Sequence, residues 1–107
     1  MARLPKFTFA FAPEAIKHLD LIERKYHGLI RQAIKERLAY IPTKETRNRK
    51  PLEQPAPCEA SWELRCGPKN CFRVFYEVDS EAQTVWVLAI GVKERNRLFI
   101  AGEEYLS

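Results

Sequence analysis

The chain has little of what the common catalytic and cofactor-binding motifs require. It holds four glycines, and none of them stands in a glycine-rich loop of the kind that cradles phosphates or dinucleotides. Its two histidines, His18 and His27, fall on or beside the first predicted helix, where surface positions are the simplest interpretation. No Ser-His-Asp or Cys-His set for nucleophilic catalysis is suggested.

The cysteines argue against a covalently stapled or metal-stapled scaffold. There are three, Cys58, Cys66 and Cys71, and an odd number does not suit the disulfide framework of a secreted protein. Their spacing does not resemble a zinc site. We therefore predict reduced thiols in a cytosolic protein, with no metal and no cofactor.

Long apolar runs are missing as well. No stretch approaches the roughly 18 residues that a membrane span needs. The apolar run 7–12 is short for the core of a signal peptide, and Pro13 closes it. The sequence therefore predicts a cytoplasmic protein without membrane contact. A chain of 107 residues fits one domain, residues 1–107, with a core that needs no staple.

Hydrophobic spacing predicts one strand and two helices in the first part of the chain. Residues 6–12 alternate, with three phenylalanines on one face, as in a strand with one buried side. Apolar residues at helical spacing predict helices over 13–25 and 29–41, the second ended by Pro42. A left-handed Gly28 between them would make a helical hairpin. The side chains expected to face the sheet are Ile16, Leu19, Ile22, Ala33, Ile34 and Leu38.

Period-two alternation dominates the second part of the chain. Three strands are expected, at 60–66, 70–78 and 83–91. The last is apolar on both faces, as in a central strand. The proline-rich segment 42–57 is predicted to be a loop with a short edge strand near Lys50–Glu53, and 98–105 a short tail.

Helices grouped before a strand meander predict an α+β fold. We expect a two-layer sandwich in the order β-α-α-β-β-β. Its helical hairpin should pack on one face of a mainly antiparallel sheet of about four strands. The other face should stay uncovered and carry Arg65 and Arg73.

The basic residues give the strongest hint of function. A net charge of +4 favours an acidic partner, either nucleic acid or an acidic protein segment. Arg65 and Arg73 are predicted to project from one sheet face near the same rung, where like charges cost a few tenths to about 1 kcal/mol. An anionic ligand is therefore expected there. Glu63 and Glu77 share this face and are interpreted as ion-pair partners.

The candidate site is a set of basic side chains on and around this face. Its members are Arg47, Arg49, Lys50, Arg65, Arg73, Lys93 and Arg95. Arginine forks bind phosphate oxygens in pairs, and lysine adds a point charge. The set could hold an RNA backbone or stabilise charge at a reacting phosphorus. A charged face that contacts an acidic protein is an equally good interpretation from charge alone.

Several sequence blocks resemble the RelE/ParE superfamily of bacterial toxins. These blocks are Phe9–Pro13, Pro51-Leu52, Trp62–Arg65, Phe72–Asp79 and Ala89–Arg95. The resemblance covers nearly the whole chain and implies the β-α-α-β-β-β fold and a cognate antitoxin as partner. It implies one of two activities: RelE-like members cut messenger RNA on the ribosome, and ParE-like members inhibit DNA gyrase.

The resemblance to the RNA-cleaving branch also implies roles for single residues. Arg73 matches the arginine of the middle strand, Lys93 the arginine after the last strand's glycine, and Arg65 a basic position on the preceding strand. These three are the predicted catalytic residues of an mRNA endoribonuclease. The predicted RNA-binding residues are Arg47, Arg49, Lys50 and Arg95.

The chain departs from that branch at three positions. Ser61 and Glu63 stand where RelE-like enzymes have lysines, and Phe99 stands at the position of a tyrosine. Tyr105 is the nearest phenol. The alternatives are therefore a ParE-like gyrase inhibitor, or an inactive toxin relative that acts only through protein binding.

Overall fold

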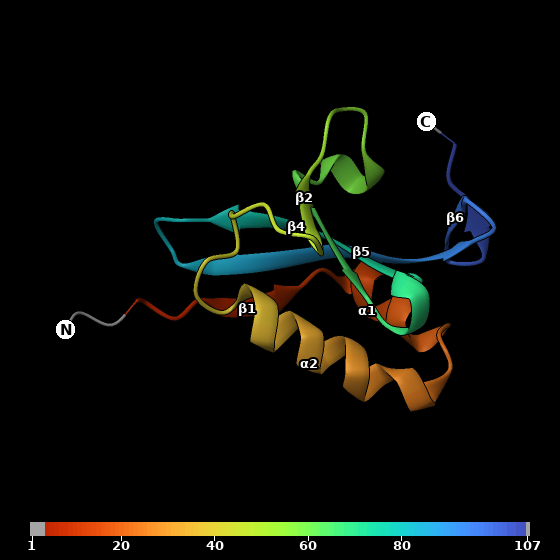
Figure 1. The fold of residues 1–107 in the computed structure, drawn as a ribbon, viewed down its shortest axis with the longest axis horizontal. Helices are drawn as coiled ribbons and strands as arrows, with labels where there is room; N and C mark the ends of the chain where they lie inside the picture. The colour runs from red at the N-terminus through yellow and green to blue at the C-terminus, as the bar shows by residue number, and fades with distance from the viewer. Residues whose placement is uncertain (1–3, 107) are drawn as a thin grey trace.

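The computed structural model describes residues 4–106, and its helices pack on one face of a sheet (Figure 1). The helices are α1 (Pro13–Asp20) and α2 (His27–Leu38), with 3-10 turns η1 (Arg24–Tyr26), η2 (Pro57–Glu59) and η3 (Pro68–Asn70). The strands are β1 (Thr8–Phe11), β2 (Arg49–Pro51), β3 (Trp62–Cys66), β4 (Phe72–Asp79), β5 (Thr84–Glu94), β6 (Arg97–Ile100) and β7 (Glu103–Glu104). The predicted α+β class is confirmed. Within residues 4–106, no helix is long and apolar enough to cross a membrane.

The sheet is larger than the sequence predicted, with seven strands among residues 4–106 instead of about four. Its order is β2-β3-β4-β5-β6-β7, and β1 joins β5 in parallel. β4 lies along one edge of β5, while β1 and β6 share the other edge. The tail predicted at 98–105 is wrong. Arg95 and Asn96 adopt φ of 49° and 65° and turn the chain tightly back into β6.

The helical hairpin breaks earlier than predicted. α1 ends at Asp20 rather than Lys25, and the chain continues through η1. The imidazole Nε2 of His27 donates to the carbonyl of Ile22 at 2.7 Å and secures this connection. Gly28 lacks the predicted left-handed conformation because α2 begins at His27 and includes Gly28 in its first turn.

Two residues that helical spacing places toward the core are exposed instead. α2 ends at Leu38, so Ile41 lies beyond it and is 44% exposed, and Ile16 on α1 is 49% exposed. The guanidinium of Arg49 donates to the carbonyls of Arg37 and Ile41 at 2.7 and 2.6 Å. The bond to Arg37 satisfies an acceptor that the end of a helix leaves unbonded, and the bond to Ile41 holds the segment that follows the helix.

The main core fills the space between the helices and the sheet. Its buried side chains are Ala15, Leu19, Ile30, Ile34, Leu38, Leu64, Cys66, Phe72, Val74, Tyr76, Val85, Val87 and Ile90. Trp62 is half-buried and stacks on Tyr76, with ring centroids 6.3 Å apart. The predicted faces of β3 and β4 are confirmed.

A β-bulge changes the facing of β5 half-way along its length. The register between β4 and β5 shifts at Phe75 and Tyr76, which leaves Leu88 as an extra residue on β5. Val87 and Ile90, on either side of it, therefore both reach the main core. The bulge also decides which residues beyond it face away from the helices.

His18 is a buried residue, so the surface position predicted for it is wrong. The imidazole is 8% exposed, and its Nδ1 accepts the backbone N–H of Ile90 at 3.2 Å. Burial lowers the pKa of His18, and the nearby carboxylate of Glu14 offsets this only in part. The neutral ring thus joins α1 to the central strand.

The hydrogen bond of the buried Tyr76 hydroxyl contributes to stability in a way that substitution can test. It donates to the carbonyl of Pro42 at 2.7 Å. Tyr76→Phe leaves that carbonyl without a donor, and we expect the free energy of unfolding to fall by about 1–3 kcal/mol. Chemical denaturation measures the loss. Tyr40→Phe, at a side chain that is half exposed, is the matched control and should change little. Equal stability of both variants would contradict the prediction.

The low pKa of His18 predicts a loss of stability in acid. The unfolded chain binds a proton near the ordinary value of 6.5, whereas the folded chain binds it only at lower pH. Stability should therefore be fully present above about pH 6.5 and decrease as pH falls below it. Thermal melting between about pH 7.5 and about pH 5 measures this. His18→Asn keeps an acceptor for Ile90 but does not titrate, so its decrease should be smaller. An identical decrease in both proteins would assign the effect to other groups.

Candidate functional site

Strand register brings four cations to the sheet face that points away from the helices. Residues directly opposite each other on neighbouring strands share a face. Lys50 lies opposite Glu63, and Arg65 lies opposite Arg73 on the next rung. Arg73 in turn lies opposite Gly91, which puts Lys93, two residues further along β5, on the same face. We call Lys50, Glu63, Arg65, Arg73 and Lys93 the cationic face.

Glu63 bridges the two arginines. Its Oε2 accepts from Nε of Arg65 at 3.0 Å, and its Oε1 accepts from Nη1 of Arg73 at 3.4 Å. Glu63 is 7% exposed and Arg73 8% exposed, so both charges are largely withdrawn from water. One carboxylate thus relieves the repulsion of the Arg65–Arg73 pair, as the sequence predicted. The similar role predicted for Glu77 is wrong, because its buried Oε1 has no hydrogen-bond partner among residues 4–106.

Backbone carbonyls of the turn between β3 and β4 bond two residues of the cationic face. The carbonyl of Asn70 accepts from Nε of Arg73 at 3.0 Å, and that of Cys71 accepts from the backbone N–H of Lys93 at 2.7 Å. Gly67 makes this turn possible, since its φ is +82° and a Cβ there would lie 2.3 Å from the ring of Phe72. One turn therefore positions residues on two different strands.

The thiols beside this turn are free, as predicted, and unreactive in character. Burial raises the pKa of Cys66 to about 11, and burial also raises the pKa of Cys71. A thiol rather than a thiolate is therefore present near neutral pH at both positions, and only the thiolate is a nucleophile.

The remaining predicted RNA-binding residues do not join the four cations. Arg49 lies opposite Leu64, on the helix side, where its guanidinium is bonded to the end of α2. Arg47 is exposed in the tight turn that precedes β2, and Arg95 is exposed in the turn between β5 and β6. Lys50 is thus the one residue of this predicted group that the register places beside Glu63.

An apolar cluster covers part of the same sheet face. The prediction that this face stays uncovered is therefore wrong. Phe75 and Ala89 are buried there under Ala60, and the loop that carries η2 lies over the sheet on the side away from α2 (Figure 1). Leu98 and Ile100 of β6 complete the cluster and lean over Gly91, where a Cβ would meet Leu98 at 2.9 Å. Arg73 therefore lies at the border between apolar and charged surface.

The groups that could move a proton on the cationic face are Glu63, Lys50 and Lys93. Phe99 lies opposite Val92, on the helix side of β6. Tyr105 lines a separate hollow near Glu14 and Pro57. Among residues 4–106 there is also no cluster of three histidine, cysteine or acidic side chains that could hold a metal ion.

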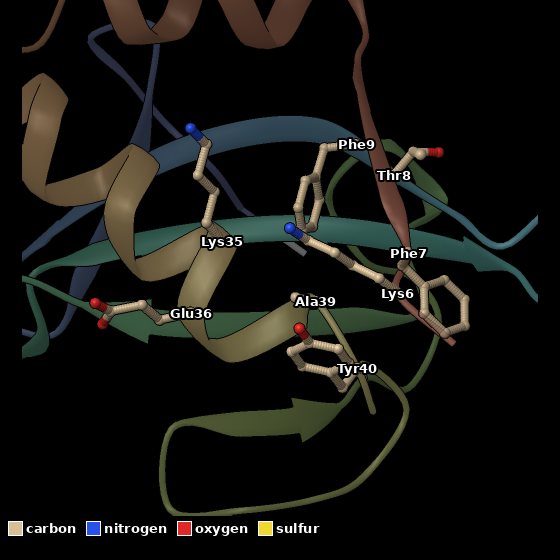
Figure 2. A pocket seen from close by; sticks show the side chains of 8 residues that line it. All are labelled: Lys6, Phe7, Thr8, Phe9, Lys35, Glu36, Ala39 and Tyr40. Carbon is tan, nitrogen blue, oxygen red and sulfur yellow. The ribbon is translucent and has the colours of Figure 1, made fainter. Parts of the chain in front are cut away.

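A second surface feature is a groove of about 660 Å³ between β1 and the end of α2 (Figure 2). Phe7, Phe9, Ala39 and Tyr40 give it an apolar lining, and Lys6, Thr8, Lys35 and Glu36 surround this lining. The two sides of the groove are joined by a hydrogen bond from the N–H of Phe7 to the carbonyl of Ala39 at 2.7 Å. Within residues 4–106, β1 pairs only with β5, so its other edge runs along the molecular surface. Sequence analysis did not predict this groove, since it depends on where β1 joins the sheet.

Comparison with known proteins reveals similarity of fold but not of sequence. No protein-family model matches the chain, and no curated protein sequence matches it. A chain in the crystal structure of the toxin–antitoxin complex RelBE2 from Mycobacterium tuberculosis does have a similar fold. The two chains are 20% identical with a TM-score of 0.69, and the match covers 87% of this chain and 98% of that chain. At this identity the match shows a shared fold.

Two neighbouring residues on opposite faces of β2 test the site directly. If the cationic face binds nucleic acid, as the sequence predicts, Lys50→Ala removes one of its charges, so the affinity for a single-stranded oligonucleotide should fall and its salt dependence should weaken by about 0.7 in the log–log slope. Arg49→Ala should leave both nearly unchanged but lower the melting temperature, because it removes donors from the end of α2. Fluorescence titration and thermal melting measure the two effects. Equal losses of affinity would contradict the face assignment.

Proposed function

We propose that this protein is the toxin of a toxin–antitoxin pair and that it inhibits translation by cleaving messenger RNA on the ribosome. The observation that carries the proposal is the placement of Arg65 and Arg73 directly opposite each other, with Lys93 on the same face. The fold shared with a chain of a toxin–antitoxin complex supports it. So do the sequence blocks that resemble the RelE/ParE superfamily.

The proposed roles follow from the chemistry of each side chain. Arg73 would stabilise the charge that develops on the scissile phosphate, since a fixed donor in a water-poor site acts strongly there. Lys93 would neutralise charge or transfer a proton. Arg65 and Lys50 would hold the neighbouring backbone phosphates. Arg47 and Arg95, exposed in turns, could add contacts further along the RNA.

The groove between β1 and α2 is the proposed site of the antitoxin. An extended segment with apolar side chains would suit its lining, and acidic residues would suit Lys6 and Lys35 beside it. A free strand edge offers backbone hydrogen bonds to such a segment. The adjacent reading frame should encode a protein with this kind of tail, and co-expression should suppress toxicity.

One observation favours a second function, the inhibition of DNA gyrase without RNA cleavage. Arg73 is largely buried and bonded to Glu63, so its guanidinium is less available to a phosphate than that of an exposed arginine. A surface that binds another protein has no need of a free guanidinium. A supercoiling assay with purified protein separates the two functions, because only a gyrase inhibitor would block it at stoichiometric amounts.

Arg73→Ala should abolish growth arrest at equal expression if the nuclease function is correct. The reason is that phosphate chemistry requires the guanidinium, whereas the main core lies on the opposite sheet face. Near-ultraviolet circular dichroism checks that the variant folds, because Arg73 is itself largely buried and bonded to Glu63. Primer extension on a reporter message should show cleavage with the wild type and none with the variant. Arg31→Ala, at an exposed position on α2, is the control and should stay toxic. Growth arrest with intact messages would contradict the nuclease function.

A further inference from the structure

We propose that Glu63 is a positioning residue that sets the orientation of both arginines and competes with phosphate for them. The proposal rests on the function proposed above and deepens it, because it assigns control of that same site to a carboxylate. The resemblance to the RNA-cleaving branch gives no such role, since the relatives have a lysine in this place. The contacts of Glu63 carry the argument.

The two oxygens of the carboxylate bond different guanidinium groups. Oε2 takes Nε of Arg65 and Oε1 takes Nη1 of Arg73, at 3.0 and 3.4 Å. With Glu63 only 7% exposed, water supplies few competing bonds, and charge-assisted bonds are strong in such surroundings. Each oxygen therefore fixes one arginine.

The bonds to Glu63 use only some of the donors of each arginine. An arginine side chain has five N–H donors in a fixed plane. Among residues 4–106, Arg65 uses only Nε, and its side chain is 31% exposed, so both terminal nitrogens remain for a ligand. Within the same residues, Arg73 uses Nε for Asn70 and one N–H of Nη1 for Glu63, which leaves Nη2 and the second N–H of Nη1. The two forks are thus held by one edge while their other donors stay free for a tetrahedral oxyanion.

The same carboxylate must also weaken the binding of that oxyanion. A phosphate that reaches Arg65 and Arg73 places its negative charge next to that of Glu63, in a site poor in water. Repulsion at such short distance is large where screening is weak. Glu63 therefore trades affinity for orientation, and the two effects can be separated by substitution.

Glu63→Gln separates them because glutamine has a single acceptor oxygen. At most one arginine can keep its bond, while the competing charge disappears. We expect affinity for a short single-stranded oligoribonucleotide to rise about three- to tenfold, and its log–log salt slope to steepen by about 0.7. Cleavage of message on the ribosome should fall at least tenfold at saturating protein. Affinity and cleavage moving in opposite directions is a result that simple loss of structure does not produce.

Glu63→Asp is the companion variant. It keeps the charge but draws the carboxylate back by one methylene, so affinity should stay near that of the wild type while cleavage falls. Near-ultraviolet circular dichroism checks that both variants fold. In ¹H–¹⁵N spectra of Glu63→Gln, the Nε–H of Arg65 or the Nη1 protons of Arg73 should exchange faster than in the wild type, because the glutamine oxygen keeps at most one of the two bonds. This reports the lost orientation without any RNA.

The outcomes separate the inference from the proposed function. Tighter binding together with faster exchange at Arg65 or Arg73 supports the role of Glu63 even if the wild type cleaves no RNA, a result that would overturn the nuclease function alone. Affinity that falls or stays the same in a folded Glu63→Gln would overturn the competition. Unchanged exchange at both arginines would overturn the positioning.

Discussion

The bulge at Leu88 is the constraint on which the rest of this structure depends. β5 pairs with other strands along both of its edges, and its two halves supply the core through different sets of residues. Before the bulge it supplies core residues beside β1, and after it supplies Ile90 to the core and Gly91 to the opposite face. Without the extra residue, one end would turn its apolar side chains away from the helices, because a shift of one residue inverts every side chain of a strand.

That inversion creates the setting of the charged pair. Gly91 stands opposite Arg73 and has no side chain to occupy the space beside it, so residues of β6 lean over the glycine instead. Arg73 becomes nearly buried, and a nearly buried guanidinium needs a partner close by. Glu63, one rung away, meets this need and simultaneously relieves the repulsion from Arg65. The surroundings of Arg73 on β4 thus depend on how the residues around Gly91 on β5 pack.

The cationic face and the groove occupy different surfaces of the molecule. The cationic face belongs to β2, β3, β4 and β5 on the side away from the helices, while the groove lies between β1 and the end of α2. A partner seated in the groove therefore need not displace a ligand from the arginines directly. Any influence between them would pass through β5, which pairs with both β1 and β4.

The sequence by itself determined the fold class, the faces of β3 and β4, and the opposition of Arg65 and Arg73. These features depend on the local spacing of apolar and charged residues, which can be read directly from the sequence. Lys50 and Arg49 show what the sequence could not predict. They lie on opposite faces of the sheet because of the register between the three-residue strand β2 and β3. His18 shows it too, because its partner Ile90 lies 72 residues away. Only the tertiary structure could decide the bulge, the burial of Arg73 and the groove, because each arises where segments distant in sequence compete for the same space.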